Sequence, residues 1–201
     1  MNPLEHVHEG CVAGRRVQIL CRHVAPLVPP GAQVIDVGCG DGLLARLLMQ
    51  ARPDIRIRGF DVLVRPQAQI PVEPFDGRKL PIHDASIDAV LFVDTLHHTV
   101  DPMVLLREAA RVSRHAIIIK DHTADGILAQ ETLRLMDQVG NARHGVALPY
   151  TYWPKAKWDD AFGALGLSVS EWKPKLGLYP WPFRWLFDRS LHFVAKLFVS
   201  R

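Results

Sequence analysis

The residues that most clearly suggest chemistry lie in one nine-residue stretch, VIDVGCGDG, which ends an apolar run. Gly38, Gly40 and Gly42 alternate with other residues, and Asp36 and Asp41 supply negative charge. Glycine permits the φ angles of a tight turn from a strand into a helix, and its bare backbone lets a ligand approach closely. The free N–H groups of the following helix face such a ligand. The stretch therefore predicts a ligand-binding turn.

The charge of this turn narrows the choice of ligand. A dinucleotide-binding turn has the spacing G-x-G-x-x-G and holds a pyrophosphate. Here the third glycine comes one position too early, and the carboxylates of Asp36 and Asp41 would repel a pyrophosphate. Asp61 ends the next expected strand and can accept hydrogen bonds from ribose hydroxyls. A cationic ligand that carries a ribose satisfies these features, and S-adenosylmethionine is such a ligand.

Four segments in order resemble the class I S-adenosylmethionine-dependent methyltransferases, particularly the small biosynthetic members. VIDVGCGDG is similar to their first motif, GFDV to their second strand with its ribose acid, and FDGRKLPIHDASIDAVLFVDTLHH to their adenine-side loop and fourth strand. The resemblance is strong over residues 31–121. It implies a Rossmann-like, doubly wound α/β fold with helices on both faces. The implied sheet has seven mostly parallel strands in the order 3-2-1-4-5-7-6, the last one antiparallel.

The resemblance also implies contacts with the methionine and ribose parts of the cofactor. Asp36 would support the turn and hold the ammonium end, and Gly38 and Gly40 would face the methionine moiety. Asp61 would bind the ribose hydroxyls. Asp94, at the end of the expected fourth strand, would lie next to the methyl group.

On the adenine side, the resemblance implies packing of Val62 against the base and a hydrogen bond from the adenine amino group to Asp76, beside Phe75. The chain departs from the family between the second and third expected strands, where the segment 62–74 leaves room for one helical turn at most. Asp76 also fits a DG turn that binds no ligand.

Candidate acid–base residues follow the next two expected strands. DTLHHT places His97 and His98 after the fourth strand, and KDHTAD places Asp121 and His122 after the fifth. Histidine transfers protons near neutral pH, so His98 and His122 are the predicted bases. The alternative is that these histidines only cap a helix or pack on the cofactor. Asp94, Asp121 and His122 could also ligate a metal, but their spacing matches no dedicated metal motif, and no metal is expected.

The hydrophobic pattern alternates between strands and helices and predicts the parallel sheet that would position these residues. The tail at 191–199 fits a final strand or an aromatic, basic helix, and its β-branched and aromatic residues favour the strand. Other expected strands cover 32–37, 55–61, 72–76 (at an edge), 87–94, 115–121 and 167–172, and expected helices cover 11–28, 43–51, 101–113 with Asp101 as N-cap, 125–139, and a segment from Pro154 to Gly163 or Gly166.

Length and composition predict one domain over 1–201, with an N-terminal helical segment 1–30, a cofactor-binding half 31–121 and an acceptor-binding half 122–201. The net charge is +3, and the sequence lacks a run of basic residues, so no nucleic-acid partner is expected. Three cysteines and an N-terminus without an apolar leader favour the cytoplasm. The oligomeric state is left open.

The acceptor side is rich in aromatic residues, and the segment 176–187 carries several of them between prolines. Aromatic walls suit a hydrophobic acceptor, and they also suit peripheral contact with the inner membrane surface. The expected function is methyl transfer from S-adenosylmethionine to oxygen or carbon of a small, hydrophobic or lipid-linked molecule. The alternatives are a non-catalytic S-adenosylmethionine-binding module and a nicotinamide-dependent oxidoreductase.

Overall fold

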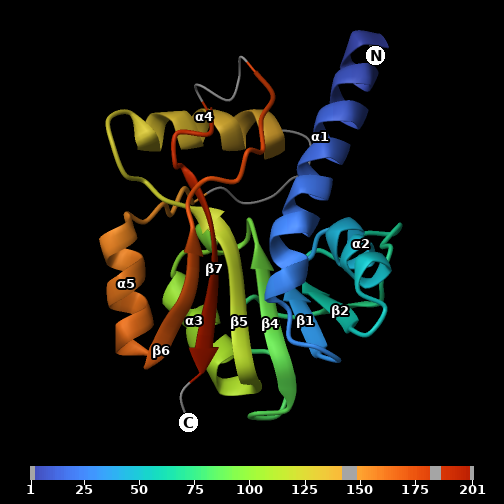
Figure 1. The fold of residues 1–201 in the computed structure, drawn as a ribbon, viewed down its shortest axis with the longest axis vertical. Coiled ribbons are helices and arrows are strands. Elements are labelled where there is room, and N and C mark those ends of the chain that lie inside the picture. Colours follow the sequence, from blue (N-terminus) through green and yellow to red (C-terminus); the bar gives the residue numbers. More distant parts are fainter. Residues whose placement is uncertain (1–2, 142–148, 182–186, 200–201) are drawn as a thin grey trace.

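The structure is a computed structural model that describes residues 3–141, 149–181 and 187–199. Its centre is a seven-stranded sheet in the order β3-β2-β1-β4-β5-β7-β6, the predicted order (Figure 1). Only β7 runs antiparallel to its neighbours. The strands are β1 (Gln33–Val37), β2 (Arg56–Asp61), β3 (Val72–Pro74), β4 (Ile87–Val93), β5 (Ser113–His122), β6 (Leu167–Lys173) and β7 (His192–Val199).

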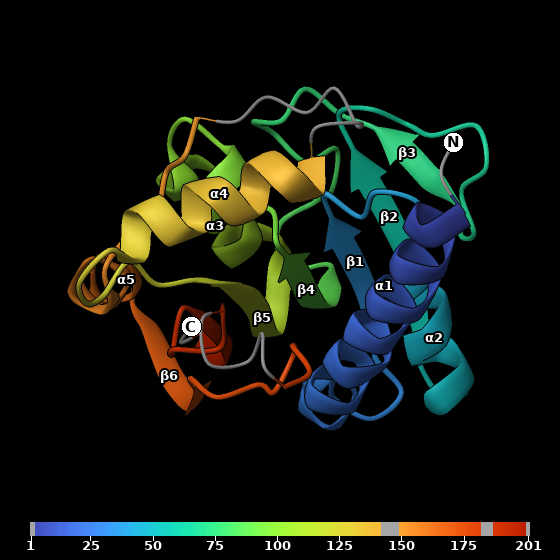
Figure 2. The ribbon, with the colours of Figure 1, turned by 90° about the horizontal axis from the view of Figure 1, so that it is seen from above.

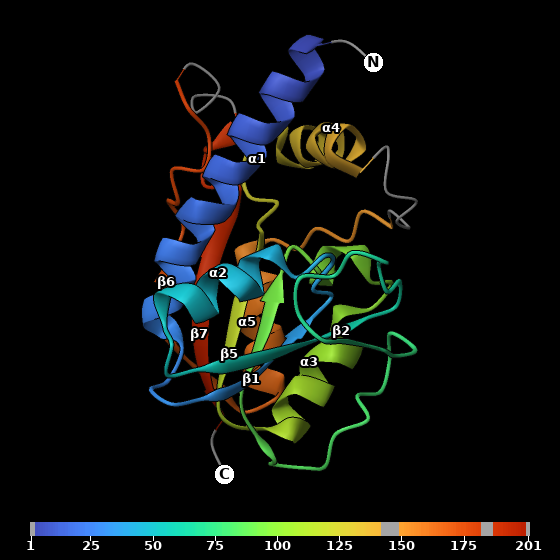
Figure 3. The ribbon, with the colours of Figure 1, turned by 90° about the vertical axis from the view of Figure 1, so that its right-hand side faces the viewer.

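Helices cover both faces of this sheet (Figure 3). α1 (Pro3–Val24) and α2 (Leu43–Ala51) pack on one face, and α3 (Pro102–Val112) and α5 (Lys155–Ala164) pack on the other. Because β1 and β4 lie between both layers, nearly all of their residues are buried, which explains their unbroken apolar runs. Short 3-10 turns follow α1 and β4, at Ala25–Leu27 and Leu96–His98.

α4 (Ala129–Asn141) lies across the carboxyl ends of β4 and β5 instead of flanking the sheet (Figures 1 and 2). In an open parallel sheet this edge is where ligands bind. The upper part of α1 stands beside the same edge in Figure 1. α1 and α4 thus lie on either side of the region above β4 and β5.

Most predicted elements are confirmed, with a few shifted limits. The segment 191–199 is a strand, and the helical alternative is wrong because these residues pair with both β5 and β6 and are largely buried. Asp101 caps α3 by accepting a hydrogen bond from the backbone N–H of Met103. α1 begins at Pro3 instead of residue 11, and α4 begins at Ala129 instead of 125. None of the helices in the described ranges is both long and apolar enough to span a membrane.

Candidate active site

The glycine turn connects β1 to α2, as the sequence predicts. Gly38 has a φ of +73°, and a Cβ atom there would lie 2.4 Å from Cγ2 of Thr95. Thr95 is fixed in this position because its hydroxyl donates a hydrogen bond to the carbonyl of Val37. Glycine is therefore required at position 38 by both backbone conformation and packing. Its predicted contact with the methionine moiety stays a prediction.

Asp61 ties the end of β2 to this turn. Its Oδ2 accepts a hydrogen bond from the backbone N–H of Gly40 at 2.8 Å, and its Oδ1 accepts one from Leu63 at 2.9 Å. The side chain is only partly buried, and each carboxylate oxygen can accept more than one hydrogen bond. The geometry leaves Asp61 able to accept bonds from a ribose while it holds the turn.

Asp36 lies beneath the turn and is 3 % exposed. Its Oδ1 has no hydrogen-bond partner among the described residues. Burial, together with the nearby charge of Asp61, raises the pKa of Asp36 to about 7. A buried carboxylate without a partner is stabilised by a cation, and the ammonium group of S-adenosylmethionine is one. The residues around the turn thus fit this cofactor.

We expect the affinity for S-adenosylhomocysteine to increase about tenfold between pH 6 and pH 8. With a raised pKa, Asp36 is mostly protonated at pH 6 and mostly ionised at pH 8, and only the ionised form attracts an ammonium group. Titration calorimetry at both pH values measures the change. Asp36→Asn should bind weakly and with the same affinity at both values. An equal pH dependence in wild type and variant would contradict the role of Asp36.

The predicted adenine-side residues lie at the surface beside β2 and β3. Val62 is 65 % exposed, and Phe75 packs edge-on against Phe60. Asp76 Oδ1 accepts hydrogen bonds from the N–H groups of Arg78 and Lys79, both at 2.8 Å, which is the geometry of the DG-turn alternative. Contacts of these side chains with adenine stay predictions. An open depression nearby is lined by Asp41, Arg65, Pro66, Gln67 and Gln69.

Asp94, at the end of β4, is bound by two cations. The ammonium of Lys120 donates a hydrogen bond to Oδ1, and the guanidinium of Arg16 on α1 lies 2.7 Å from Oδ2. Burial alone would raise the pKa of Asp94, but Lys120 and Arg16 outweigh it and hold the pKa well below its ordinary value. Arg16 is therefore a partner within the site.

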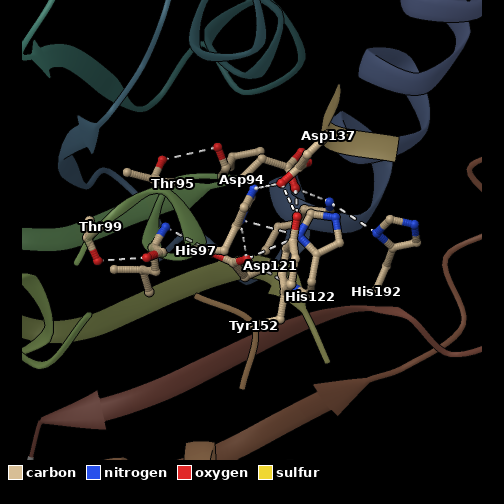
Figure 4. Close-up of polar contacts among 12 residues, drawn as sticks. Asp94, Thr95, His97, Thr99, Asp121, His122, Asp137, Tyr152 and His192 are labelled. Atoms are coloured by element: carbon tan, nitrogen blue, oxygen red, sulfur yellow. Dashed lines mark hydrogen bonds and ion pairs between the residues drawn. The ribbon is translucent and has the colours of Figure 1, made fainter. Parts of the chain in front are cut away.

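His97 and Asp121 form the centre of a buried polar cluster (Figure 4). Nδ1 of His97 lies 2.6 Å from Oδ1 of Asp121, whose Oδ2 accepts a hydrogen bond from the backbone N–H of Leu96. Nε2 of His97 lies 3.3 Å from Oδ2 of Asp137 on α4, and the hydroxyl of Tyr152 donates to that same carboxylate oxygen. Burial would lower the pKa of His97, but the charge of Asp121 dominates and raises it to about 10.

The two predicted bases occupy different surroundings. His122 is 3 % exposed, and its Nδ1 lies 3.3 Å from both Nδ1 of His97 and Oδ1 of Asp121. Burial and the charge of Lys120 lower the pKa of His122 to about 4. His98 is only partly buried, and its ring centroid lies 4.0 Å from that of His97. Their catalytic roles stay predictions, but His98 is the more accessible of the two.

Sequence reasoning missed several members of this cluster. Lys120 is fully buried although it follows three isoleucines in an apolar strand, and a charge in such a run was the available signal. Asp137 and His192 come from segments far along the chain, and no local spacing connects them to His97. The ring centroids of His192 and His122 lie 4.7 Å apart.

Comparison with known proteins agrees with this geometry. Residues 35–119 match the model of the methyltransferase domain family. The chain is 30 % identical over 97 residues to 27-O-demethylrifamycin SV methyltransferase of Amycolatopsis mediterranei, covering 42 % of this chain and 35 % of that one. It is 38 % identical over 88 residues to an uncharacterized methyltransferase of Mycobacterium tuberculosis, covering 40 % and 45 %. The chain thus spans less than half the length of these curated relatives.

Solved structures share the fold. A methyltransferase solved in complex with the Trm112 methyltransferase activator of Haloferax volcanii superposes with a TM-score of 0.70 at 18 % identity, over 96 % of both chains. The mitomycin 7-O-methyltransferase MmcR superposes with a TM-score of 0.65 at 18 % identity, over 92 % of this chain and 54 % of that one. The sequence match over residues 35–119, the sheet order and the acidic glycine turn together support a class I S-adenosylmethionine-dependent methyltransferase domain in this chain, with S-adenosylmethionine as its cofactor.

Proposed function

We propose that this protein transfers the methyl group of S-adenosylmethionine to a small hydrophobic or lipid-linked acceptor, with oxygen as the favoured atom and carbon as the second. The observation that carries the proposal is the enclosed polar cluster at the carboxyl ends of β4 and β5, beside the glycine turn. Methyl transfer from a sulfonium needs mainly alignment of the acceptor with the methyl group, and an oxygen acceptor must also lose a proton.

The cluster favours an enzyme over a module that only binds the cofactor. Charged groups from α1, β4, β5 and α4 converge here, and desolvating such groups is unfavourable unless they are fully paired. The expected cofactor contacts lie in the glycine turn and at Asp61 and Asp94, so the other groups of the cluster point to an acceptor. The names of the rifamycin and mitomycin methyltransferases denote methylation at oxygen, which supports oxygen here. The methyltransferase match includes the glycine turn, so a nicotinamide cofactor has no support.

Apolar side chains around this edge support a hydrophobic acceptor. Ile127, Leu128 and Leu135 are exposed on and before α4, and Trp181 is 86 % exposed. Tyr179 lies inward against Phe187 and His192. Pro182, Phe183 and Trp185 of the predicted aromatic segment 176–187 lie outside the described residues. We propose that this edge contacts the cytoplasmic surface of the inner membrane, and flotation with liposomes tests that contact.

We place the acceptor atom against His98, the accessible histidine of the cluster. His98→Ala should lower kcat at least about 100-fold and leave the affinity for S-adenosylhomocysteine within about threefold. The assay follows tritiated methyl groups from S-adenosylmethionine into the organic-soluble fraction of a cell extract. His83→Ala is the matched control, because His83 is exposed and far from the cluster in the sequence. Label found only in nucleic acid or protein, or no label at all, would contradict the proposed acceptor class.

A further inference from the structure

The nitrogen atoms that the polar cluster leaves unsatisfied point to a ligand. Nδ1 of His98 is buried and has no hydrogen-bond partner among the described residues, and Nε2 of His97 is buried with only the carboxylate of Asp137 beside it, at 3.3 Å. His97 is 2 % exposed as a whole residue. Buried polar atoms in native proteins nearly always have a partner, so the free Nδ1 of His98 beside this long His97–Asp137 contact needs an explanation.

These two histidines and Asp137 have the geometry of a metal site. One potential ligand atom from each of the three residues lies within 4.8 Å of the other two. Nε2 of His97 and Oδ2 of Asp137 are 3.3 Å apart. Two ligands that each bind one metal ion at about 2.1 Å are separated by roughly 3.0–3.4 Å, depending on the angle between them. The separation between Nε2 of His97 and Oδ2 of Asp137 lies within this range.

The groups behind the ligands are those that metal sites use. A histidine that binds metal through one nitrogen usually donates the other N–H to a carboxylate, which fixes the tautomer and orients the ring. His97 has this arrangement, because its Nδ1 lies 2.6 Å from Oδ1 of Asp121. Asp137 is oriented in the same way by the hydroxyl of Tyr152. Figure 4 shows Asp121, Asp137 and Tyr152 gathered around His97.

A second group in the same cluster, Asp94 with His97 and His122, has similar spacing but does not suit a metal. Both oxygens of Asp94 are already bound by cations, Oδ1 by Lys120 and Oδ2 by Arg16. A metal ion there would face two fixed positive charges at close range. Among the described side chains, no lysine or arginine contacts Asp137; its contacts are His97 and Tyr152.

We infer that His97, His98 and Asp137 bind one divalent transition-metal ion. Two imidazoles and one carboxylate suit Zn²⁺, Co²⁺ or Fe²⁺, and three protein ligands leave a coordination position open. The role of the ion rests on the proposed function: the open position would take the acceptor oxygen. A bound hydroxyl loses its proton to water more readily, and the oxygen then forms the O–CH₃ bond as the S–CH₃ bond breaks, releasing S-adenosylhomocysteine.

Binding of Co²⁺ and Zn²⁺ to the chelator-treated full chain tests the site without cofactor or acceptor. We expect one equivalent of Co²⁺ with visible d–d absorption, and displacement of that absorption by Zn²⁺. His98→Ala and Asp137→Asn should each weaken Zn²⁺ binding by at least about tenfold to 100-fold in calorimetry. His83→Ala and Asp160→Asn alter exposed residues of the same types and should bind as wild type does.

Several outcomes would overturn the inference. Equal Zn²⁺ affinity of His98→Ala and wild type, or no Co²⁺ binding by wild type, would show that a proton and not a metal ion lies between His97 and Asp137. Circular dichroism confirms that each variant is folded, and His98→Gln serves as a second variant if His98→Ala is not. Full methyl transfer after chelation would reject the ion and keep the proposed function. Tight Co²⁺ binding by a protein that transfers no methyl group would keep the metal site and reject the proposed function.

Discussion

Replacing Lys120 with methionine is expected to lower the free energy of unfolding by about 3 kcal/mol or more, because it breaks a buried ion pair from one side. Lys120 is 0 % exposed, and its ammonium group binds Asp94. Methionine fills a similar volume, so the loss comes from charge and not from a cavity. Asp94 would keep Arg16, whose side chain is 32 % exposed, and His122, whose Nδ1 lies 3.9 Å from Oδ1 of Asp94. Urea unfolding followed by tryptophan fluorescence measures the difference.

The double variant Lys120→Met with Asp94→Asn separates this cause from general disruption of β5. It removes both charges of the pair, so it should recover most of the stability that the single variant loses. Lys155→Met is the control, because Lys155 pairs with Asp159 on the exposed surface of α5 and its loss should cost no more than about 0.5 kcal/mol. A single variant within about 1 kcal/mol of wild type, or a double variant that is less stable still, would contradict the argument.

The pattern of the sequence was sufficient to predict the sheet because the central parallel strands β1 and β4 are buried on both faces. The apolar runs before Asp36 and Asp94 could fit only the centre of such a sheet, and the structure places them there. The ends of helices were harder to predict. The N-terminal helix extends back to Pro3 through polar residues whose periodicity is weak, and local propensity gave no sign of that extension.

The two halves of the site differ in how far the sequence revealed them. Asp36, Gly38 and Asp61 lie within two consecutive strand ends, so their proximity follows from the topology alone. The polar cluster brings Arg16 and Asp137 to β4 and β5 from two helices that pack above the sheet. The position of those helices depends on tertiary packing, and no local spacing encodes it.

Asp61→Ala is expected to weaken binding of S-adenosylhomocysteine by about 100-fold or more. Loss of two hydrogen bonds from ribose hydroxyls to a carboxylate costs about 3 kcal/mol in total, and 1.4 kcal/mol corresponds to a factor of ten. The variant also removes the acceptor for the N–H of Gly40, which loosens the glycine turn from β2. Both effects act in the same direction on affinity, and titration calorimetry measures their sum.

Two further variants show whether the loss of affinity in Asp61→Ala comes from the lost ribose contact or from the loosened glycine turn. Asp61→Asn keeps one carbonyl oxygen for the N–H of Gly40 but loses the negative charge, so it should bind with intermediate affinity. Glu73→Ala removes a carboxylate on the neighbouring strand β3, where it pairs with Arg58 at the surface, and should leave affinity unchanged. The acidic turn is the feature that selects S-adenosylmethionine over a dinucleotide. An Asp61→Ala variant that binds S-adenosylhomocysteine within threefold of wild type would therefore show that the ribose does not bind at the end of β2.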